Sequence, residues 1–233
     1  MGKLRAEISK DEEIRYISHL DYARSIERAI RRANLPVAYS EGFNPHMKIA
    51  FASALAVGVT SEAEYLDIEM KEDVELDLLC TRLCMQLPPG IKLKQAKYMP
   101  PEQKSQALMA MADLAQYTIA VPLGSSGFAG CKSAVAAFNQ ALEVRYIRES
   151  PKGKKEIDVK DYLEQDVAVR EENGMAILLM SIKITPAGSI KPGEILHVLA
   201  EQFHLEVEEA GARIHRTGLF TTASATRVSL FDA

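Results

Sequence analysis

The sequence predicts an α+β protein in which one arrangement of short strands and helices occurs twice in tandem. Apolar and polar residues alternate in several short segments, whereas in others the apolar residues recur at helical spacing. The same order of elements occurs before and after residues 100–106, a stretch of proline and polar residues with the composition of a linker. Of the 233 residues, 47% are hydrophobic and 26% are charged, which is typical of a globular chain that buries a core.

The first half begins with a strand at residues 3–9, where Leu4, Ala6 and Ile8 alternate with polar residues. A charged turn follows at residues 10–13, and residues 14–17 form a second short apolar run. We therefore expect an N-terminal hairpin in addition to the elements that follow.

A helix is predicted to begin at Ser18, because Ser18 and Asp21 have the spacing of a capping box. Apolar residues then recur at helical spacing as far as Ala33, and Asn34 and Pro36 end the helix. The rest of this half is predicted as strands at 48–53 and 63–70, a helix at 74–87 and a strand at 91–98. This β-α-β-β-α-β order is the pattern of a ferredoxin-like domain.

The second half repeats the pattern. Its predicted elements are a strand at 117–122, a helix at 128–142, a strand at 144–148, a hairpin of 167–170 and 175–184, a helix at 192–203 and a closing strand at 205–214. We therefore predict two tandem ferredoxin-like domains, residues 1–99 and 113–233, joined by a linker at 100–112. The tail after Arg216 is rich in threonine, serine and alanine, and we expect it to be only partly ordered.

The overall charge restricts the possible functions. The net charge is −4 and the isoelectric point is about 5.8, which excludes a protein that wraps nucleic acid over its whole surface but allows a local basic patch.

Three cysteines are poor evidence for a disulfide framework. The sequence has no apolar run long enough to span a membrane and no secretory signal at its start, so we expect a cytoplasmic protein with no membrane partner.

Such a basic patch is predicted on the first helix. Arg24, Arg28 and either Arg31 or Arg32 share one helix face, where they can contact successive phosphates. Residues 15–48 contain six basic and three acidic residues, counting Arg15 and Lys48 among the basic ones. In the alternative interpretation this is a solvated face on which Glu27 pairs with neighbouring arginines.

Two further groups of residues are candidates for binding. The loop at 42–48 combines the permissive backbone of Gly42 and Asn44 with the donors His46 and Lys48, so it can hold a phosphate, a nucleobase or a partner's loop, or simply connect two strands. Three residues near the end of the chain extend a basic surface if the two halves pack with these faces aligned: Arg213, His215 and Arg216. The catalytic residues remain unknown, and His19 and His46 are weak acid–base candidates because no nucleophile or titrating partner is identified beside them.

Several motifs are incomplete. Cys80 and Cys84 lack the third cysteine of a radical SAM cluster, and the glycine-rich segment at 124–133 has Cys131 where a phosphate-binding loop needs glycine. The acidic residues between 62 and 77 are most often the exposed face of a half-buried sheet. We expect no metal site and no cofactor in this chain.

The sequence closely resembles the radical-SAM-linked domain family of unknown function over its first seventy residues. The segments that carry the resemblance are Arg-Tyr-Ile-Ser-His-Leu-Asp at 15–21, Arg-Arg-Ala at 31–33, Tyr-Ser-Glu-Gly-Phe-Asn-Pro-His at 39–46, Gly-Val at 58–59 and Ser-Glu-Ala-Glu-Tyr-Leu-Asp at 61–67. Looser matches follow at 191–194 and 213–217. Members are encoded beside, or fused to, radical SAM enzymes that often carry a cobalamin-binding domain.

The resemblance implies a radical SAM enzyme as partner, with SAM and the iron–sulfur cluster on that partner. Together with the basic helix it suggests a non-catalytic accessory protein that binds or presents RNA. Two alternatives stay open. One is a stand-alone RNA-processing or RNA-modifying enzyme that uses a histidine as acid or base, and the other is a pure protein-docking adaptor.

Overall fold

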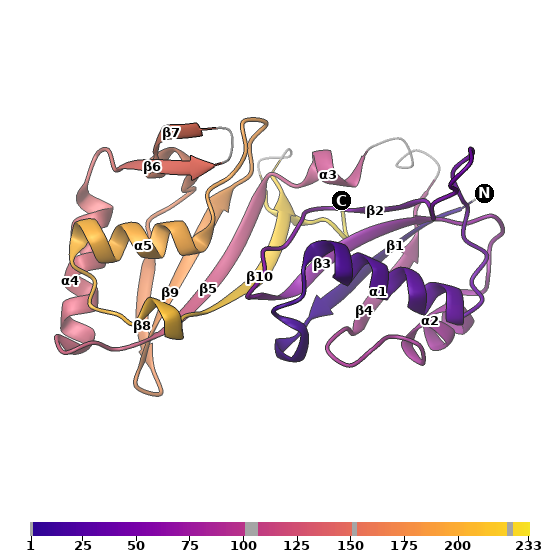
Figure 1. Ribbon diagram of the computed structural model, residues 1–233, viewed down its shortest axis with the longest axis horizontal. Coiled ribbons are helices and arrows are strands. Elements are labelled where there is room, and N and C mark those ends of the chain that lie inside the picture. The colour runs from indigo at the N-terminus through magenta and orange to yellow at the C-terminus, as the bar shows by residue number, and fades with distance from the viewer. Residues whose placement is uncertain (1, 101–106, 151–152, 223–225) are drawn as a thin grey trace. The chain divides into compact units, whose positions relative to one another are not determined.

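The structure, a computed structural model, describes residues 2–100, 107–150, 153–222 and 226–233. The protein has a mixed α+β fold whose paired strands are mostly antiparallel (Figure 1). Its chain divides into two compact units, one made of residues 1–113 and 218–233, the other of residues 114–217.

The first unit has the predicted β-α-β-β-α-β order. Its elements are β1 (Lys3–Lys10), the 3-10 helix η1 (Glu12–Ile14), α1 (His19–Arg32), β2 (Ile49–Phe51), β3 (Val59–Glu69), α2 (Leu76–Cys84), β4 (Leu93–Tyr98), α3 (Leu108–Met111) and β11 (Val228–Ser229). Strand β1 lies between β3 and β4, and β2 pairs with β3 at residues 66–68; all these pairs are antiparallel. Apolar side chains of β1 and β3 form one core with those of α1 and α2, which lie against one face of the strands (Figure 1).

The predicted N-terminal hairpin is wrong. Ile14 ends η1, and residues 15–17 form a turn instead of a strand. The Lys10 ammonium is buried beneath this turn and donates to the carbonyl oxygens of Arg15 at 3.0 Å and Ile17 at 3.2 Å. A buried ammonium group needs such acceptors. Because these two carbonyl groups point inward to Lys10, they cannot accept hydrogen bonds from a neighbouring strand.

The second unit contains β5 (Leu114–Pro122), α4 (Gly127–Gln140), β6 (Arg145–Ser150), β7 (Gly153–Asp158), η3 (Val159–Tyr162), β8 (Ala168–Glu172), β9 (Met175–Lys183), α5 (Pro192–Phe203) and η4 (Glu209–Gly211). Strand β9 pairs with both β5 and β8, whereas β6 and β7 form a separate two-stranded sheet. The predicted hairpin turn is confirmed: Asn173 and Gly174 both have positive φ, at 53° and 74°, which suits a two-residue turn between twisted strands.

The last strand begins later in the chain than predicted. It is β10 (Arg213–Thr221), whereas the expected strand at 205–214 is mostly a loop containing η4. Leu205 is buried in the core of the second unit and Val207 packs against it, although neither lies in a strand. The alternating apolar residues that predicted a strand are therefore buried loop residues.

The tail also differs from the prediction. Residues 218–233 belong to the first compact unit, although the sequence had placed them in the second domain. Strand β11 pairs with β10, and Leu219 and Leu230 are fully buried, so apolar burial holds the described part of the tail. Of the predicted linker, residues 101–106 lie outside the described residues, and 108–111 form α3. No helix in the described ranges is both long and apolar enough to cross a membrane.

Candidate functional site

Helix α1 carries the basic residues that the sequence singled out, and its start is the predicted one. The Ser18 hydroxyl oxygen accepts the Asp21 backbone N–H at 3.1 Å, and the hydroxyl donates to the Asp21 carboxylate at 2.7 Å. This confirms the cap and sets the angular position of every side chain along the helix.

The two faces of α1 differ in chemistry. The buried face consists of Tyr22, Ile26, Ala29 and Ile30. At 3.6 residues per turn the arginines fall on the opposite side, and all four are exposed. We call this surface the arginine face; it comprises Arg24, Arg28, Arg31 and Arg32, with Leu20, which is 66% exposed, at its N-terminal end.

The arginine face is only partly neutralised. A guanidinium nitrogen of Arg24 lies 3.5 Å from the Asp21 carboxylate, and Arg32 donates to the backbone carbonyl of Gln86 at 2.6 Å. Within the described part of the chain, Arg28 and Arg31 have no ion-pair partner, and Glu27 pairs with neither Arg24 nor Arg31. The charge compensation required by the solvated-face interpretation therefore does not form.

The loop before β2 presents its side chains to solvent. Tyr39 and Met47 form an isolated bridge across its base, and the Ser40 hydroxyl accepts the His46 backbone N–H at 3.0 Å. At its tip Gly42 has a φ of 119°, which residues with a side chain rarely adopt. The Phe43 side chain is fully exposed. Asn44 and His46 are exposed as well, so the loop offers an aromatic ring beside polar groups.

Two other predicted binding residues are already engaged by neighbouring side chains. The Arg15 guanidinium lies 2.7 Å from Glu12 and covers the Tyr16 ring at 4.9 Å. Arg216 is buried in the second unit, where its guanidinium lies 5.7 Å from the centre of the Tyr117 ring. The expectation that Arg216 extends a basic surface is therefore wrong, because a desolvated guanidinium stacked on an aromatic ring is not available to a ligand. Arg213 is exposed and His215 half-buried.

A cavity of about 620 Å³ in the first unit brings together two residues that the sequence had considered separately, His19 and Lys48. His19 is the first residue of α1, and its ring meets the Phe51 ring edge to face with 5.2 Å between their centres. Lys48 precedes β2 and lies 3.1 Å from the Glu69 carboxylate. The second histidine candidate, His46, does not line this cavity.

The first unit also contains a buried polar layer that the sequence analysis missed. Strand β1 directs Arg5 and Glu7 away from the helices, and β3 supplies Tyr65 and Asp67 directly opposite them. Arg5 is fully buried and donates to both Asp67 carboxylate oxygens, at 2.8 and 3.2 Å. The available signal was the match of opposite charges at facing positions of the two strands, which requires the register to be known.

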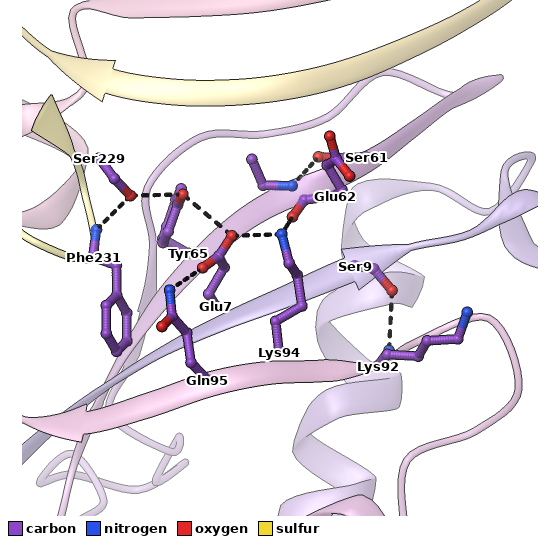
Figure 2. Close-up of polar contacts among 11 residues, drawn as sticks. Glu7, Ser9, Ser61, Glu62, Tyr65, Lys92, Lys94, Gln95, Ser229 and Phe231 are labelled. Carbon is purple, nitrogen blue, oxygen red and sulfur yellow. Dashed lines mark hydrogen bonds and ion pairs between the residues drawn. The ribbon is translucent and has the colours of Figure 1, made fainter. Parts of the chain in front are cut away.

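Figure 2 shows the neighbouring part of this layer. The Glu7 carboxylate contacts the Tyr65 hydroxyl, the Lys94 ammonium at 2.8 Å and the Gln95 amide, and the Tyr65 hydroxyl reaches Ser229 at 3.0 Å. The acidic residues between 62 and 77 were predicted to lie on an exposed face of a sheet. This is wrong for Glu64 and Asp67, which are both buried.

This environment predicts a pH dependence of stability. Burial, together with the nearby Glu7 carboxylate, raises the pKa of Tyr65 to about 12, whereas an exposed tyrosine has a pKa near 10. The folded state therefore holds the Tyr65 proton more tightly than the unfolded state, and the stabilisation from this proton is complete below pH 10. We expect the free energy of unfolding to fall as the pH rises from about 10 to about 12.

The measurement is urea unfolding at a series of pH values in the wild type and in Tyr65→Phe. The variant has no phenol at this position, so its free energy of unfolding should fall less steeply over the same pH range. Equal slopes in the two proteins would contradict the assignment.

No group of three or more potential metal ligands occurs among the residues that the structure describes. Cys80 and Cys84 both lie on α2, and burial raises the pKa of the Cys80 thiol, which disfavours the thiolate that a metal binds.

Comparison with solved structures finds matches at low sequence identity. A chain of the crystal structure of a Cbf5–Nop10–Gar1 complex aligns with a TM-score of 0.50 and 11% identity, over 94% of this chain and 48% of that one. A chain of the archaeal box H/ACA sRNP Nop10–Cbf5 complex aligns with a TM-score of 0.46 and 10% identity, over 99% and 52%. This chain thus spans about half the length of each solved chain, and the first likeness supports the fold alone.

No curated protein matches the sequence. A family model does match, over residues 3–192, which is most of the chain. The protein therefore belongs to the family described as "Uncharacterized protein conserved in bacteria (DUF2344)".

Proposed function

We propose that this protein is a non-catalytic accessory module of a radical SAM enzyme and that it binds single-stranded RNA through the arginine face of α1. The observation that carries the RNA proposal is the exposure of four arginines on one helix face, two of them without an ion-pair partner among the described residues. Such a row matches the repeat of negative charge along a phosphate backbone.

Exposed apolar and aromatic side chains that are close to the arginines in the sequence suit the binding of single-stranded RNA. Phosphates need cations, and unpaired bases need flat or apolar surfaces to stack on. The first unit exposes Leu20, Tyr16 and Phe43, three large apolar or aromatic side chains that would otherwise remain in water. Because the whole protein carries a charge of −4, attraction of RNA is concentrated where the arginines cluster.

The radical SAM partner is proposed from the sequence resemblance, and SAM and the iron–sulfur cluster would then be on that partner. We also propose that both units are ferredoxin-like. The series β1-α1-β2-β3-α2-β4 and β5-α4-β8-β9-α5-β10 have the same order, with β6 and β7 as an insertion in the second. The resemblance to a chain of a Cbf5–Nop10–Gar1 complex concerns the fold alone, so the RNA proposal rests on the arginine face.

The test of the proposal is the salt dependence of binding to a fluorescently labelled, single-stranded RNA. Four arginines that each neutralise one phosphate should give a slope of log K against log salt of about −2.8, from about −0.7 per contact on a single strand. Displacement of the exposed Lys48–Glu69 ion pair by a phosphate would add a fifth contact and give a slope of about −3.5. A slope near zero, or no binding at low salt, would refute RNA binding by this face.

A second prediction concerns Phe43. Replacing it with alanine should weaken RNA binding by about 1–3 kcal/mol, because one base loses its stacking partner. Stability should be unchanged, since the ring makes no buried contact in the free protein. Leu142→Ala in the second unit is the matched control, because Leu142 is also almost fully exposed. Equal affinities for all three proteins would show that the loop does not touch RNA.

A further inference from the structure

The cavity in the first unit follows the open edge of a strand. All three residues of β2 line it, and so do Lys48 before the strand and Ser53 and Ala54 after it. The start of α3 contributes Leu108 and Met109. Among the described pairings, β2 pairs only with β3. The volume of about 620 Å³ is in the usual range of small-molecule sites.

One end of the cavity carries two lysines because of the strand register. Lys3 on β1 faces Glu69 on β3, and the Glu69 backbone N–H donates to the Lys48 carbonyl at 3.0 Å. Lys3 on β1 and Lys48, just before β2, therefore lie on either side of the Glu69 carboxylate. The Lys48–Glu69 ion pair is about half exposed on both sides, so an incoming anion can displace it at little cost.

The second carboxylate at the cavity, Asp67, does not repel an anion strongly. Arg5 neutralises it with two hydrogen bonds, and Lys3 lies 4.0 Å away. Three cations, Lys3, Arg5 and Lys48, thus face the two carboxylates of Asp67 and Glu69. Because Arg5 already binds Asp67, the two lysines at the cavity favour a ligand that carries a negative group.

The rest of the lining suits a flat body with polar edges. Ala50 lies directly opposite Asp67, so a small side chain leaves room there. The ring of Phe51, held edge to face by His19, supplies an aromatic wall. The backbone hydrogen bonds between this segment and β3 involve Lys48 and Ala52. Successive residues of a strand turn their backbone groups to opposite sides, so the N–H and C=O of Phe51 point to the open edge, where they can serve as a donor and an acceptor.

We propose that this cavity binds one nucleotide, with its phosphate at Lys3 and Lys48 and its base beside Phe51. The negative group and the flat polar body follow from the lining; the choice of a nucleotide among such anions rests on the proposed RNA function. The same chemistry is offered by a free mononucleotide and by the 5′-phosphorylated end of an RNA strand.

Calorimetric titration of the full chain with uridine 5′-monophosphate tests the proposal, and the other three mononucleotides are titrated in parallel. Saturable binding of at least one is expected, with uridine and inorganic phosphate each binding at least about tenfold more weakly than the corresponding nucleotide. Absence of saturation by any mononucleotide, or equal binding of phosphate alone, would overturn it.

Two variants locate the site. Lys48→Glu should weaken mononucleotide binding at least about tenfold, because it removes a charged donor and adds repulsion. Ala50→Trp, at an exposed position, should block the cavity without changing the charge. Lys132→Glu, at an exposed position of α4, is the matched control and should bind like the wild type. Mononucleotide binding that survives both cavity variants would place the site elsewhere and refute the proposal.

The same assay distinguishes a free mononucleotide from the end of an RNA strand. It also distinguishes the cavity proposal from the arginine-face proposal. Displacement of the mononucleotide by a 5′-phosphorylated trinucleotide, but not by its 5′-hydroxyl form, would identify a strand end; no displacement by either would identify a free nucleotide. The variant Arg28→Glu/Arg31→Glu should lose RNA but keep the mononucleotide. RNA binding without mononucleotide binding would refute the cavity proposal alone, and the reverse result would refute the arginine-face proposal alone.

Discussion

Reversing the charge of Arg28 and Arg31 to glutamate is expected to weaken binding of single-stranded RNA more than a hundredfold. Each arginine would lose a charge-assisted contact to a phosphate, and two such contacts are worth about 3 kcal/mol or more. The new carboxylates add repulsion. Because both side chains are exposed and neither has an ion-pair partner among the described residues, the free energy of unfolding should hardly change.

The measurement is fluorescence anisotropy with labelled RNA at several salt concentrations. Losing two phosphate contacts should reduce the magnitude of the log–log salt slope by about 1.4. The matched control is Lys132→Glu/Arg170→Glu, which makes the same change of charge at exposed positions of the second unit. If control and test variants bind RNA equally well, net charge and not the arginine face determines the affinity.

The same variant distinguishes an adaptor from an RNA-binding module. Tagged wild type and variant are used to capture partners from the host lysate. Loss of a captured radical SAM enzyme, with RNA affinity unchanged, would mean that the arginine face docks a protein. Loss of RNA, with the enzyme retained, would support presentation of an RNA substrate.

Replacing Arg5 with alanine is expected to destabilise the protein by about 3–5 kcal/mol. Arg5 is 0% exposed and Asp67 is 4% exposed, so the substitution leaves a buried carboxylate without its main partner. The variant also loses the donor that binds the backbone oxygens of Leu230 at 2.7 Å and Ala233 at 3.1 Å. The C-terminal segment should therefore detach early, which hydrogen exchange of residues 228–233 would detect as faster exchange.

Urea unfolding of the wild type and of Arg5→Ala measures this loss in the free energy of unfolding. Lys92→Ala removes a surface ion pair with Asp11 and should leave stability nearly unchanged, since the Lys92 side chain is 76% exposed. The double variant Arg5→Met/Asp67→Leu should recover much of the loss, because it removes both buried charges and fills a similar volume. If Arg5→Ala is no less stable than Lys92→Ala, the pair does not hold this layer together.

Local signals in the sequence predicted most of the secondary structure correctly. The cap at Ser18, the turn at Asn173 and Gly174 and the helix beginning at Pro192 each depend on neighbouring residues, and the structure confirms them. The exposed face of α1 was predictable for the same reason, since helical periodicity alone separates Ile26 from Arg28.

Elements whose partners are distant in the sequence were not predictable in this way. Leu205 was assigned to a strand because burial in a loop produces the same alternation as a strand, and the tail was assigned to the wrong domain because nothing near Leu230 shows that Arg5 binds its carbonyl oxygen.

The candidate sites show the same division. The sequence by itself determined the arginine face, because a helix arranges its side chains through local geometry. Only the tertiary structure decided that Arg216 is buried on Tyr117, that Arg5 meets Asp67, and that His19 and Lys48 share one cavity. Burial and cross-strand register depend on which distant segments pair, and the hydrophobic effect that drives this pairing responds to the total apolar area buried and not to any local motif.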